Sequence, residues 1–497
     1  MKIILNLTQI LCLVITFLLA IATPAASAPL PFGTQISLNG QPWAVAWSQW
    51  QVDATDKVYI GITDAGITQL LGVELLDSEN VAKQPVKWLF QPTPTPLLLN
   101  TRLNRGHRYL DVTELAQKAG WQLKILGNTL SINTPAAQAE AIYLHRLLGS
   151  DRPTVERNIL WAPGLRWRQQ YIDLGASHFP VVWLEIDLHT PGLVLKPIWS
   201  DPNTLIGTAP LIQIAESYGA AAAINGGFFN RHERLPLGAI RRDGKWRSSP
   251  ILNRGAIAWN DLGQVKVGHL SLKETLTTFQ DLLPILALNS GYVQAGISRY
   301  TSDWGATYTP LNDSEIIVVV QNHQVTAQLS GGVAGKTAFS IPSDGYLLVI
   351  RDDSAAANSL PIGTIVSLNR TTVPSDFADY PQILGAGPLL VQNHQIVLDA
   401  KAEKFSTAFI KETAPRSAIG TTTAGTLLMV AVHNRSGGVG PTLAEVAEIL
   451  QQIGCIDALN LDGGSSTSLY LGGQLLDRLP STAARIHNSI GVFVPDL

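Results

Sequence analysis

Cysteine is almost absent from this chain of 497 residues, which contains only Cys12 and Cys455. We expect Cys12 to be removed with an N-terminal signal, so the mature protein keeps one thiol, forms no intramolecular disulfide and relies on its hydrophobic core. Cys455 stands in an apolar run, where buried packing is expected. Charged residues are also few, at 15% against 46% hydrophobic residues, a balance that excludes a disordered chain.

Basic runs are missing as well, and the formal net charge is -3. A nucleic-acid-binding protein usually presents a basic face, so we expect no nucleic-acid partner. Beyond the N-terminus no apolar run reaches membrane-spanning length. The chain also lacks a Gly-x-Ser-x-Gly nucleophile elbow, a dinucleotide fingerprint and histidines at zinc-ligand spacing.

The N-terminus has the pattern of an export signal. Lys2 precedes a largely apolar run from Ile3 to Ala22, and Ala26-Ser27-Ala28 matches the small-x-small cleavage pattern. This pattern predicts a signal peptide over 1–28, cleavage after Ala28 and a periplasmic or extracellular protein. An uncleaved membrane anchor is the alternative, but polar residues interrupt the apolar run.

Residues 29–135 are predicted to form a small α+β accessory domain. The sequence favours a helix at Val112–Ala119, capped by Asp111, and a β-hairpin at Trp121–Ile132. The segment Tyr109–Ile132 resembles the closing half of the stalk domain at the N-terminus of some copper amine oxidases. That resemblance implies no chemistry, and leaves two roles open: contact with the cell wall, or spacing the rest of the protein from the membrane.

Residues 136–160 are predicted to form a helical linker, with one helix at Ala136–Leu148. The remaining part, 161–497, contains many strand patterns and two helix patterns, at Ala209–Tyr218 and Thr442–Ile453. The second helix begins with a capping box. Strands and helices do not alternate regularly, so we expect an α+β fold with a β-sheet-rich catalytic domain and a few packed helices.

The most informative segment is Ala458–Thr467, in which an apolar strand ends at Asp462. Gly463 and Gly464 follow, and their amides could form an anion-binding nest. The hydroxyls of Ser465, Ser466 and Thr467 add donors and are interpreted as binding groups. A carboxylate beside such a cradle suggests hydrolysis or group transfer at a charged or sugar-like substrate. The alternative is a tight turn that Asp462 merely caps.

Three further segments carry candidate binding residues. Asn225 precedes Gly226 and Gly227, and its amide could bind a sugar hydroxyl or phosphate, whereas Phe228 and Phe229 are expected in the core beneath a hairpin turn. Gly387 lies in a glycine turn before a strand, for which a structural role is the default. Arg416 precedes another strand, and its planar guanidinium matches phosphate or carboxylate oxygens. A surface ion pair is the commoner fate of a lone arginine.

Taken in order, these motifs resemble the phosphodiester glycosidase family, which includes the lysosomal uncovering enzyme. The resemblance extends from about residue 180 to the C-terminus and rests on five segments: Asn225–Phe229, Gly385–Pro388, Pro415–Gly420, Asn460–Thr467 and Arg485–Gly491. It implies hydrolysis at an anomeric carbon that bears a phosphodiester. An envelope or exopolysaccharide glycan is the substrate class expected for an exported relative.

The resemblance also implies roles for individual residues. Asn225, Arg416, Asp462 and Asn488 fall on family motifs, and the binding set is completed by the flanking glycines, the hydroxyls of the Asp462 segment, Arg435 and Arg485. Two positions depart from the family pattern: Ser465 replaces a third glycine, and His433-Asn434-Arg435 replaces Asp-Gly-Arg. Arg435 survives that change as a candidate anion contact.

A mechanism follows as a hypothesis. Arg416, supported by Arg435 or Arg485, would hold the phosphate, and Asp462 would act as nucleophile, general base or electrostatic stabiliser. No second carboxylate is identified, because Asp187 is expected to face solvent. No cofactor is required, and calcium bound by Asp462 with backbone carbonyls is an option. The alternative function is a non-catalytic envelope protein that binds polysaccharide or peptidoglycan, and the oligomeric state stays open.

Overall fold

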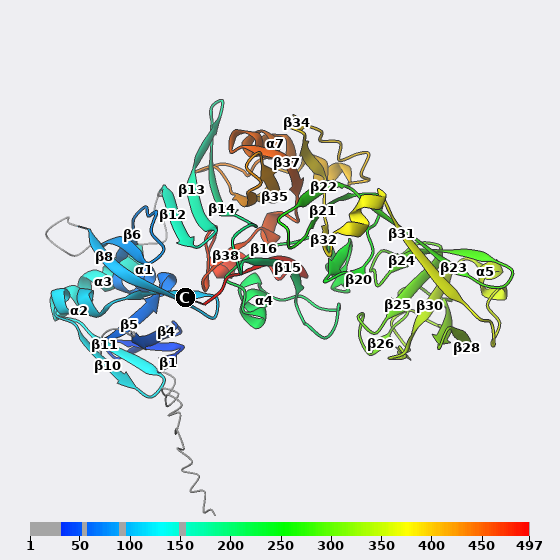
Figure 1. The fold of residues 1–497 in the computed structure, drawn as a ribbon, viewed down its shortest axis with the longest axis horizontal. Coiled ribbons are helices and arrows are strands. Elements are labelled where there is room, and N and C mark those ends of the chain that lie inside the picture. Colours follow the sequence, from blue (N-terminus) through cyan, green and yellow to red (C-terminus); the bar gives the residue numbers. More distant parts are fainter. Residues whose placement is uncertain (1–30, 52–56, 89–95, 149–155, 497) are drawn as a thin grey trace, which may run out of the picture.

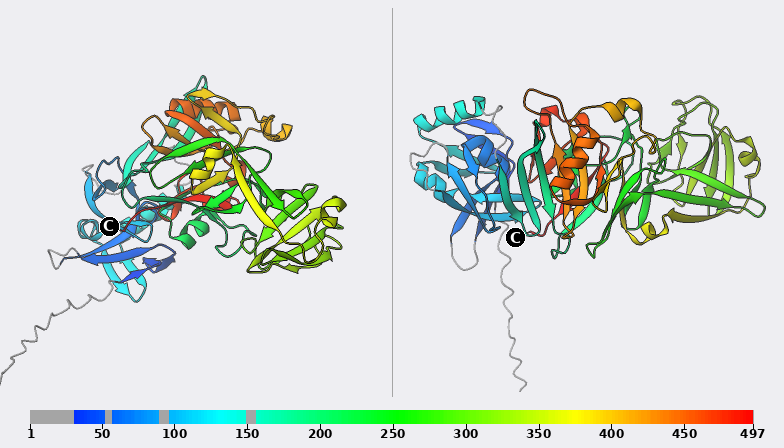
Figure 2. Two further views of the ribbon diagram at one scale, coloured as in Figure 1. Left: turned by 45° about the vertical axis from the view of Figure 1, so that its right-hand side comes forward. Right: turned by 90° about the horizontal axis from the view of Figure 1, so that it is seen from above.

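The computed structural model describes residues 31–51, 57–88, 96–148 and 156–496. The predicted signal peptide and Cys12 lie outside the described residues. Strands dominate, and the sheets form three groups in a row, with the N-terminal residues at one end and residues 271–373 at the other (Figures 1 and 2). This is the sheet-rich α+β fold predicted from the sequence. None of the helices that the structure describes has the length and apolar character needed to cross a membrane.

In its described residues, the N-terminal group contains two sheets and three helices. The seven-stranded sheet has the spatial order β1 (Phe32–Gly33), β4 (Trp47–Gln51), β5 (Val58–Thr63), β9 (His107–Asp111), β8 (Leu97–Asn104), β7 (Lys83–Trp88) and β6 (Val73–Leu75). The four-stranded sheet has the order β10 (Gln122–Leu126), β11 (Thr129–Asn133), β2 (Gln35–Leu38) and β3 (Gln41–Trp43). The helices are α1 (Asp64–Leu71), α2 (Thr113–Ala119) and α3 (Ala136–Leu148).

The predicted hairpin is confirmed as β10 and β11, and the predicted helix at 136–148 is confirmed as α3. Helix α3 packs on the N-terminal group, where Trp121 Nε1 donates to Gln138 Oε1 at 2.7 Å. Helix α2 begins after Val112, which makes no side-chain capping bond. Asp111 instead accepts the Thr113 amide at 2.9 Å, so the predicted aspartate cap is displaced by one residue.

The central group contains three larger sheets. The eight-stranded sheet has the order β12 (Arg157–Ala162), β13 (Leu165–Leu174), β14 (Ser177–Ile186), β36 (Leu427–Val432), β35 (Arg416–Thr422), β37 (Cys455–Asn460), β33 (Leu389–Gln392) and β34 (Gln395–Ile396). A five-stranded sheet has the order β15 (Val194–Trp199), β40 (Asn488–Phe493), β16 (Ala222–Asn225), β38 (Leu469–Leu471) and β39 (Gln474–Leu475). Another has the order β20 (Lys245–Ser248), β19 (Ile240–Arg242), β32 (Gln382–Gly385), β21 (Gly255–Trp259) and β22 (Val265–His269).

The third group is inserted between β22 and β32. Its main sheet has the order β28 (Gln324–Ser330), β27 (Ile316–Gln321), β30 (Gly345–Arg351), β25 (Gly296–Thr301), β24 (Leu282–Leu288), β23 (Ser271–Thr277) and β31 (Ser367–Val373). The short pair β26 (Thr307–Tyr308) and β29 (Phe339–Ser340) and the helix α5 (Ser354–Asn358) accompany it. Sequence patterns predict several of these strands but not their separate sheet.

Three helices belong to the central group: α4 (Leu211–Tyr218), α6 (Thr407–Lys411) and α7 (Leu443–Gln452). The capping box of α7 is confirmed, with Thr442 and Glu445 bonded reciprocally. Helix α4 begins later than predicted because Ala209 pairs with Ile486 in an isolated bridge. Cys455 is buried as predicted, at 3% exposure, and burial raises the pKa of its thiol to about 12.

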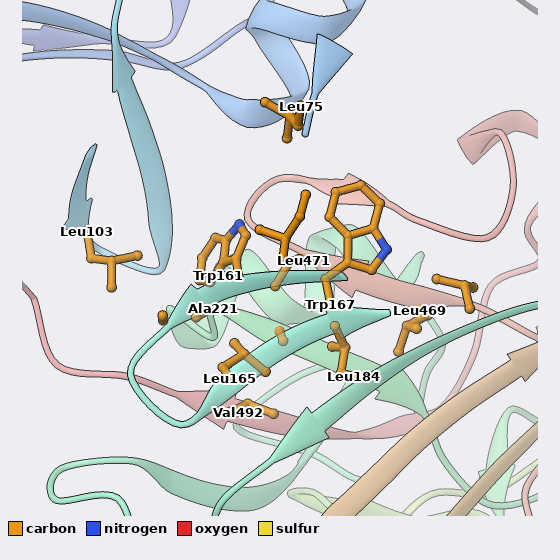
Figure 3. Close-up of a cluster of buried hydrophobic side chains, with 14 of the residues drawn as sticks. Leu75, Leu103, Trp161, Leu165, Trp167, Leu184, Ala221, Leu469, Leu471 and Val492 are labelled. Carbon is orange, nitrogen blue, oxygen red and sulfur yellow. The ribbon is translucent and has the colours of Figure 1, made fainter. Parts of the chain in front are cut away.

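One hydrophobic cluster joins the N-terminal group to the central sheets. Figure 3 shows Leu75 and Leu103 next to Trp161, Leu165 and Leu471 within that cluster. A core shared in this way resists separation of the two parts, because parting them would expose its apolar surface to water.

A buried polar contact accompanies this core. The Asp64 carboxylate of α1 accepts hydrogen bonds from Trp161 Nε1 of β12 and from Arg108 Nε at 3.0 Å. Arg108 also donates to Gln84 Oε1 at 3.1 Å. Asp64 and Arg108 are 2% and 1% exposed, so both charges are paired away from water.

Candidate active site

The candidate site is built on the loop that follows β37. Leu461 N donates to Ser417 O at 2.9 Å, and Asp462 N donates to Gly226 O at 3.0 Å. Gly464 N donates to Pro415 O at 2.7 Å. These bonds hold the loop between the start of β35 and the turn after β16, so two sheets jointly position Asp462. Its side chain remains partly exposed.

The loop amides do not form the open anion cradle expected from the sequence. Gly463 N donates to Asp462 Oδ1 at 3.0 Å, Gly464 N is bound to Pro415, and the amides of Ser466 and Thr467 close a single 3-10 turn, η3 (Gly464–Ser466). Ser466 and Thr467 are buried, which leaves Ser465 as the exposed hydroxyl of the three. The loop amides therefore leave few donors for an anionic ligand, and such donors would have to come mainly from side chains.

The local structure explains why Gly463 and Gly464 are glycines. Gly464 has φ +64, a conformation that side chains rarely adopt. A Cβ on Gly463 would lie 3.1 Å from Pro415 O and 3.2 Å from Arg416 Cδ. The glycines thus let the loop pass close to the first residue of β35.

The Asp462 carboxyl has a perturbed pKa. Burial raises the pKa to about 6, against the opposing effects of the neighbouring Ser466 hydroxyl, the Arg231 charge, the Gly463 amide and the Arg416 charge. Desolvation disfavours the charged form of an acid, and nearby cations favour it. Asp462 is consequently ionised at neutral pH but close to its titration range.

Arg416 lies beside this loop rather than in a surface ion pair. Arg416 is 1% exposed, and its Nη2 donates to Glu412 O at 2.8 Å. The Glu412 carboxylate is 3.8 Å away and largely exposed. Nε and Nη1 are buried without a hydrogen-bond partner in the described structure. Burial lowers the pKa of Arg416, and its two unpaired donors are suited to ligand oxygens.

Asn225 is completely buried and all of its polar side-chain atoms are engaged. Nδ2 donates to the backbone oxygen of Asp462 at 2.7 Å. Oδ1 accepts from Ser417 Oγ at 2.6 Å and from Ser468 N at 3.0 Å. The direct substrate contact expected from the sequence does not fit this geometry. Asn225 is a positioning residue, which fixes the loop that carries Asp462.

Asn488 acts similarly on the Gly226-Gly227 turn. Its Oδ1 accepts the Gly227 amide at 2.7 Å, and its Nδ2 lies 3.1 Å from His487 Nδ1. A Cβ on Gly226 would lie 2.1 Å from Asn488 Oδ1, so only glycine fits there. His487 is fully buried, and burial lowers its pKa to about 4.

The turn after Asn225 is not a hairpin. Strand β16 belongs to the five-stranded sheet, whereas β17 (Phe229–Asn230) pairs with β18 (Leu235–Pro236). Phe228 and Phe229 are therefore partly exposed, and their predicted core positions are wrong. Because the chain changes sheets here, alternation within one sheet does not decide their burial.

The remaining predicted site residues lie in other environments. Arg435 Nη1 donates to Ser177 Oγ at 2.6 Å, and its guanidinium covers Phe179. Arg485 donates to Thr208 O. Gly387 N donates to Asn460 O at 2.9 Å, which gives this glycine a structural place behind the loop. Asp187 is exposed, as expected from the sequence.

Sequence reasoning missed Arg231, whose charge lowers the pKa of Asp462. Arg231 is exposed and follows β17 directly. Its place shortly after the Asn-Gly-Gly turn was the available signal. Arg231 and Arg416 together put positive charge around one carboxylate.

His433, one of the residues that differ from the family pattern, also makes specific contacts. His433 Nε2 lies 2.8 Å from Asp477 Oδ2, and Asp477 Oδ1 accepts Leu469 N at 2.8 Å. The adjacent Arg478 donates from Nη2 to Gly464 O at 3.0 Å. His433 thus belongs to a network that reaches the Asp462 loop. Across the described ranges, no group of three or more His, Cys, Asp or Glu side chains is placed to hold a metal ion.

The family model for phosphodiester glycosidases matches residues 314–493, which include Arg416, Asp462 and Asn488. Residues 314–493 of this chain belong to the phosphodiester glycosidase family. A hypothetical protein from Synechocystis is 40% identical, with a TM-score of 0.86 over 94% of this chain and 100% of that chain.

More distant structures are also similar. A protein from Burkholderia pseudomallei K96243 is 17% identical, with a TM-score of 0.53 over 95% of this chain and 97% of its own, and shares the fold. The catalytic domain of zebrafish N-acetylglucosamine-1-phosphodiester alpha-N-acetylglucosaminidase, auto-inhibited by its pro-peptide, is 15% identical, with a TM-score of 0.35 over 69% of this chain and 88% of that chain. No curated protein matches this chain.

Proposed function

We propose that this protein is an exported hydrolase that releases a sugar from a sugar-1-phosphodiester in an envelope or exopolysaccharide glycan. Family membership supports the reaction class. The observation that carries the proposal is the Asp462 loop beside Arg416, with a carboxyl group whose pKa burial raises to about 6 against the charges of Arg231 and Arg416.

Arg416 and Arg231 supply the hydrogen-bond donors and positive charge that a phosphodiester leaving group needs. The free Nε and Nη1 donors of Arg416 would bind phosphate oxygens, and Arg231 would add charge from the solvent side. Positive charge held near the phosphate stabilises the negative charge that grows as the bond to the sugar breaks. A phosphate so bound leaves without a strong general acid, which fits a site with one well-placed carboxyl group.

The bond that breaks joins the anomeric carbon to the phosphodiester oxygen, and its electron pair leaves with the phosphate. Water then supplies a hydroxyl group to the anomeric carbon and a proton to the phosphate monoester or solvent. Ionised Asp462 faces the positive character that develops on the sugar. It acts as nucleophile, as base toward water or as a charge that stabilises the sugar.

Hydrolysis of a panel of sugar-1-phosphodiesters by the purified protein tests the proposal. Wild type should release free sugar and Asp462→Asn should not. Asp457→Asn is a matched control, because Asp457 lies on β37, the strand that precedes the Asp462 loop, and accepts a hydrogen bond from Asn393 N at 2.9 Å. Full activity in Asp462→Asn would contradict the assignment.

Reaction in oxygen-18 water distinguishes the bond that is cut. Label in the released sugar supports glycosidase chemistry, whereas label in the phosphate would show cleavage of the phosphorus-oxygen bond.

The proposed export of the protein is tested separately. Protein recovered from the periplasm or medium should begin at Pro29. A chain that retains residues 1–28 there would contradict the proposed cleavage.

A further inference from the structure

A nearly buried arginine holds the Asp462 loop through its carbonyl oxygens. Arg478 donates from Nη2 to Gly464 O at 3.0 Å and from Nη1 to Ser465 O at 3.2 Å. The same Nη1 also donates to Thr482 O at 3.2 Å, and the Arg478 side chain is 9% exposed. The loop is thus fixed through its carbonyl groups as well as through its amides.

Asp477 supplies the counter-charge for this arginine. Its side chain is 0% exposed, and Oδ2 lies 3.4 Å from Arg478 Nε. Oδ1 accepts the Leu469 amide at 2.8 Å. Arg478 Nε makes no hydrogen bond within the described residues, so its contact with Oδ2 is electrostatic only. Because a buried charge that lacks hydrogen bonds costs free energy, Oδ2 needs another donor.

His433 supplies that donor. Its Nε2 lies 2.8 Å from Asp477 Oδ2, and an ionised carboxylate only accepts hydrogen bonds, so Nε2 carries the proton. Val432, the preceding residue, pairs with Arg416 between β36 and β35, which places His433 at the same end of the sheet as Arg416. We call His433, Asp477 and Arg478 the loop clamp.

The loop clamp also explains why histidine suits this position. In the family pattern an aspartate stands where this chain has His433. A second carboxylate would add negative charge beside buried Asp477 and would give its Oδ2 no donor, which disfavours the ionised form of both groups. The imidazole instead completes the hydrogen bonding of Asp477. The departure from the family pattern is thus matched to its surroundings.

We propose that the loop clamp positions the Asp462 carboxyl group and that His433 is the positioning residue on which the clamp depends. The His433 proton holds the Asp477 carboxylate, which in turn holds Arg478 against the loop carbonyls. Without that proton the loop loosens and the Asp462 carboxyl group is displaced. The effect on turnover rests on the proposed function, whereas the effect on the loop does not.

The kinetic test compares three variants of His433 on the sugar-1-phosphodiester that wild type hydrolyses fastest. In His433→Leu and His433→Asp, kcat should fall about tenfold or more while KM changes less than about twofold, because Arg416 keeps its donors. His433→Gln retains an N–H donor and should keep at least about half of the wild-type kcat. The control is His178→Leu, which breaks an exposed pair with Asp173 and should behave as wild type.

Hydrogen exchange tests the loop clamp without substrate. Gly464 N donates to Pro415 O at 2.7 Å and Thr467 N donates to Gly464 O at 3.3 Å, so both amides report on the loop. Peptides that cover residues 463–468 should exchange about tenfold faster in His433→Leu than in wild type or His433→Gln, while peptides from β37 do not change.

Unchanged exchange in His433→Leu, or faster exchange throughout the chain, would overturn the loop clamp. So would a kcat for His433→Asp at or above that of wild type. A loss of kcat that His433→Gln shares would show that the donor to Asp477 is not what matters. His433→Asp carries the same comparison if His433→Leu does not fold. If wild type hydrolyses no diester, the proposed reaction fails and the exchange rates alone decide the loop clamp.

Discussion

The side-chain amide of Asn225 donates a 2.7 Å hydrogen bond to the backbone oxygen of Asp462, although 237 positions separate the two residues. Because Asn225 ends β16 and Asp462 follows β37, this bond ties the loop after a strand of one sheet to the end of the middle strand of another. The candidate catalytic carboxyl group is thus positioned by a residue that never reaches the surface.

Substitution of Asn225 should reveal this positioning role. In Asn225→Asp, a carboxylate replaces the amide donor and faces the Asp462 carbonyl oxygen, which leaves buried groups unpaired at a cost of about 1–3 kcal/mol. We expect kcat to fall by at least about tenfold with little change in KM, because the loop is displaced while the phosphate donors remain. Denaturant unfolding and kinetics measure both effects, and the exposed Asn322→Asp should behave as wild type. A change in KM alone would indicate direct substrate contact.

Stability should depend on pH through Asp462. Its pKa is raised to about 6 in the folded protein, so between about pH 4 and 6 the folded state binds more protons than the unfolded state. This contribution to stability is therefore present at low pH and lost as pH rises through about 6. Asp462→Asn should be more stable than wild type at pH 7 and similar at pH 4.

Buried His487 has the opposite effect, because its pKa is lowered to about 4 and its contribution is lost as pH falls. The measurement is therefore the difference in unfolding free energy between wild type and Asp462→Asn at each pH, from which His487 cancels. A constant difference from pH 4 to 7 would contradict a raised pKa for Asp462.

Arg231 should control the acidic limb of the activity profile. In Arg231→Gln a cation that lowers the pKa of Asp462 is lost, so kcat/KM should rise at a higher pH than in wild type. Arg234→Gln is the matched control in the same exposed turn. An unchanged midpoint in Arg231→Gln, measured from pH 4.5 to 8, would show that Arg231 does not act on Asp462.

The two family arginines should differ when changed to lysine. Arg416→Lys removes the planar fork beside the loop, and KM for a phosphodiester should rise by about tenfold or more. Arg435→Lys should have little effect, because Arg435 contacts Ser177 and Phe179 instead. Initial-rate kinetics of both variants test this contrast, and comparable losses would place Arg435 in the site after all.

Breaking the buried Asp64–Arg108 pair should destabilise the protein strongly. Asp64→Asn leaves the Arg108 charge buried without its partner, a change that typically costs about 3–5 kcal/mol. Glu114→Gln, which breaks the exposed pair with Lys118, should cost less than about 1 kcal/mol. Urea unfolding compares the two variants, and equal stabilities would show that the buried pair contributes nothing.

Local sequence signals predicted the local structure well. The capping box at Thr442, the hairpin over β10 and β11, helix α3 and the burial of Cys455 all depend on neighbours close in the chain or on residue hydrophobicity. The family motifs also placed Asp462 and Arg416 next to each other, because both segments flank adjacent strands of one sheet.

Contacts between distant segments escaped prediction. The occupied amides of the loop, the burial of Asn225 and the exposure of Phe228 depend on which sheet each strand joins, and a single sequence does not contain that pairing. Arg231 escaped for a related reason, since its charge acts through space on a residue more than two hundred positions away. Motif order identified the loop, whereas only the fold shows which groups surround it.

The bond from Trp161 to Asp64, which Arg108 also contacts, joins the N-terminal sheets to the central group beside the shared hydrophobic cluster. Were the protein attached to a support through these sheets, the fold would set the distance between that support and the Asp462 loop.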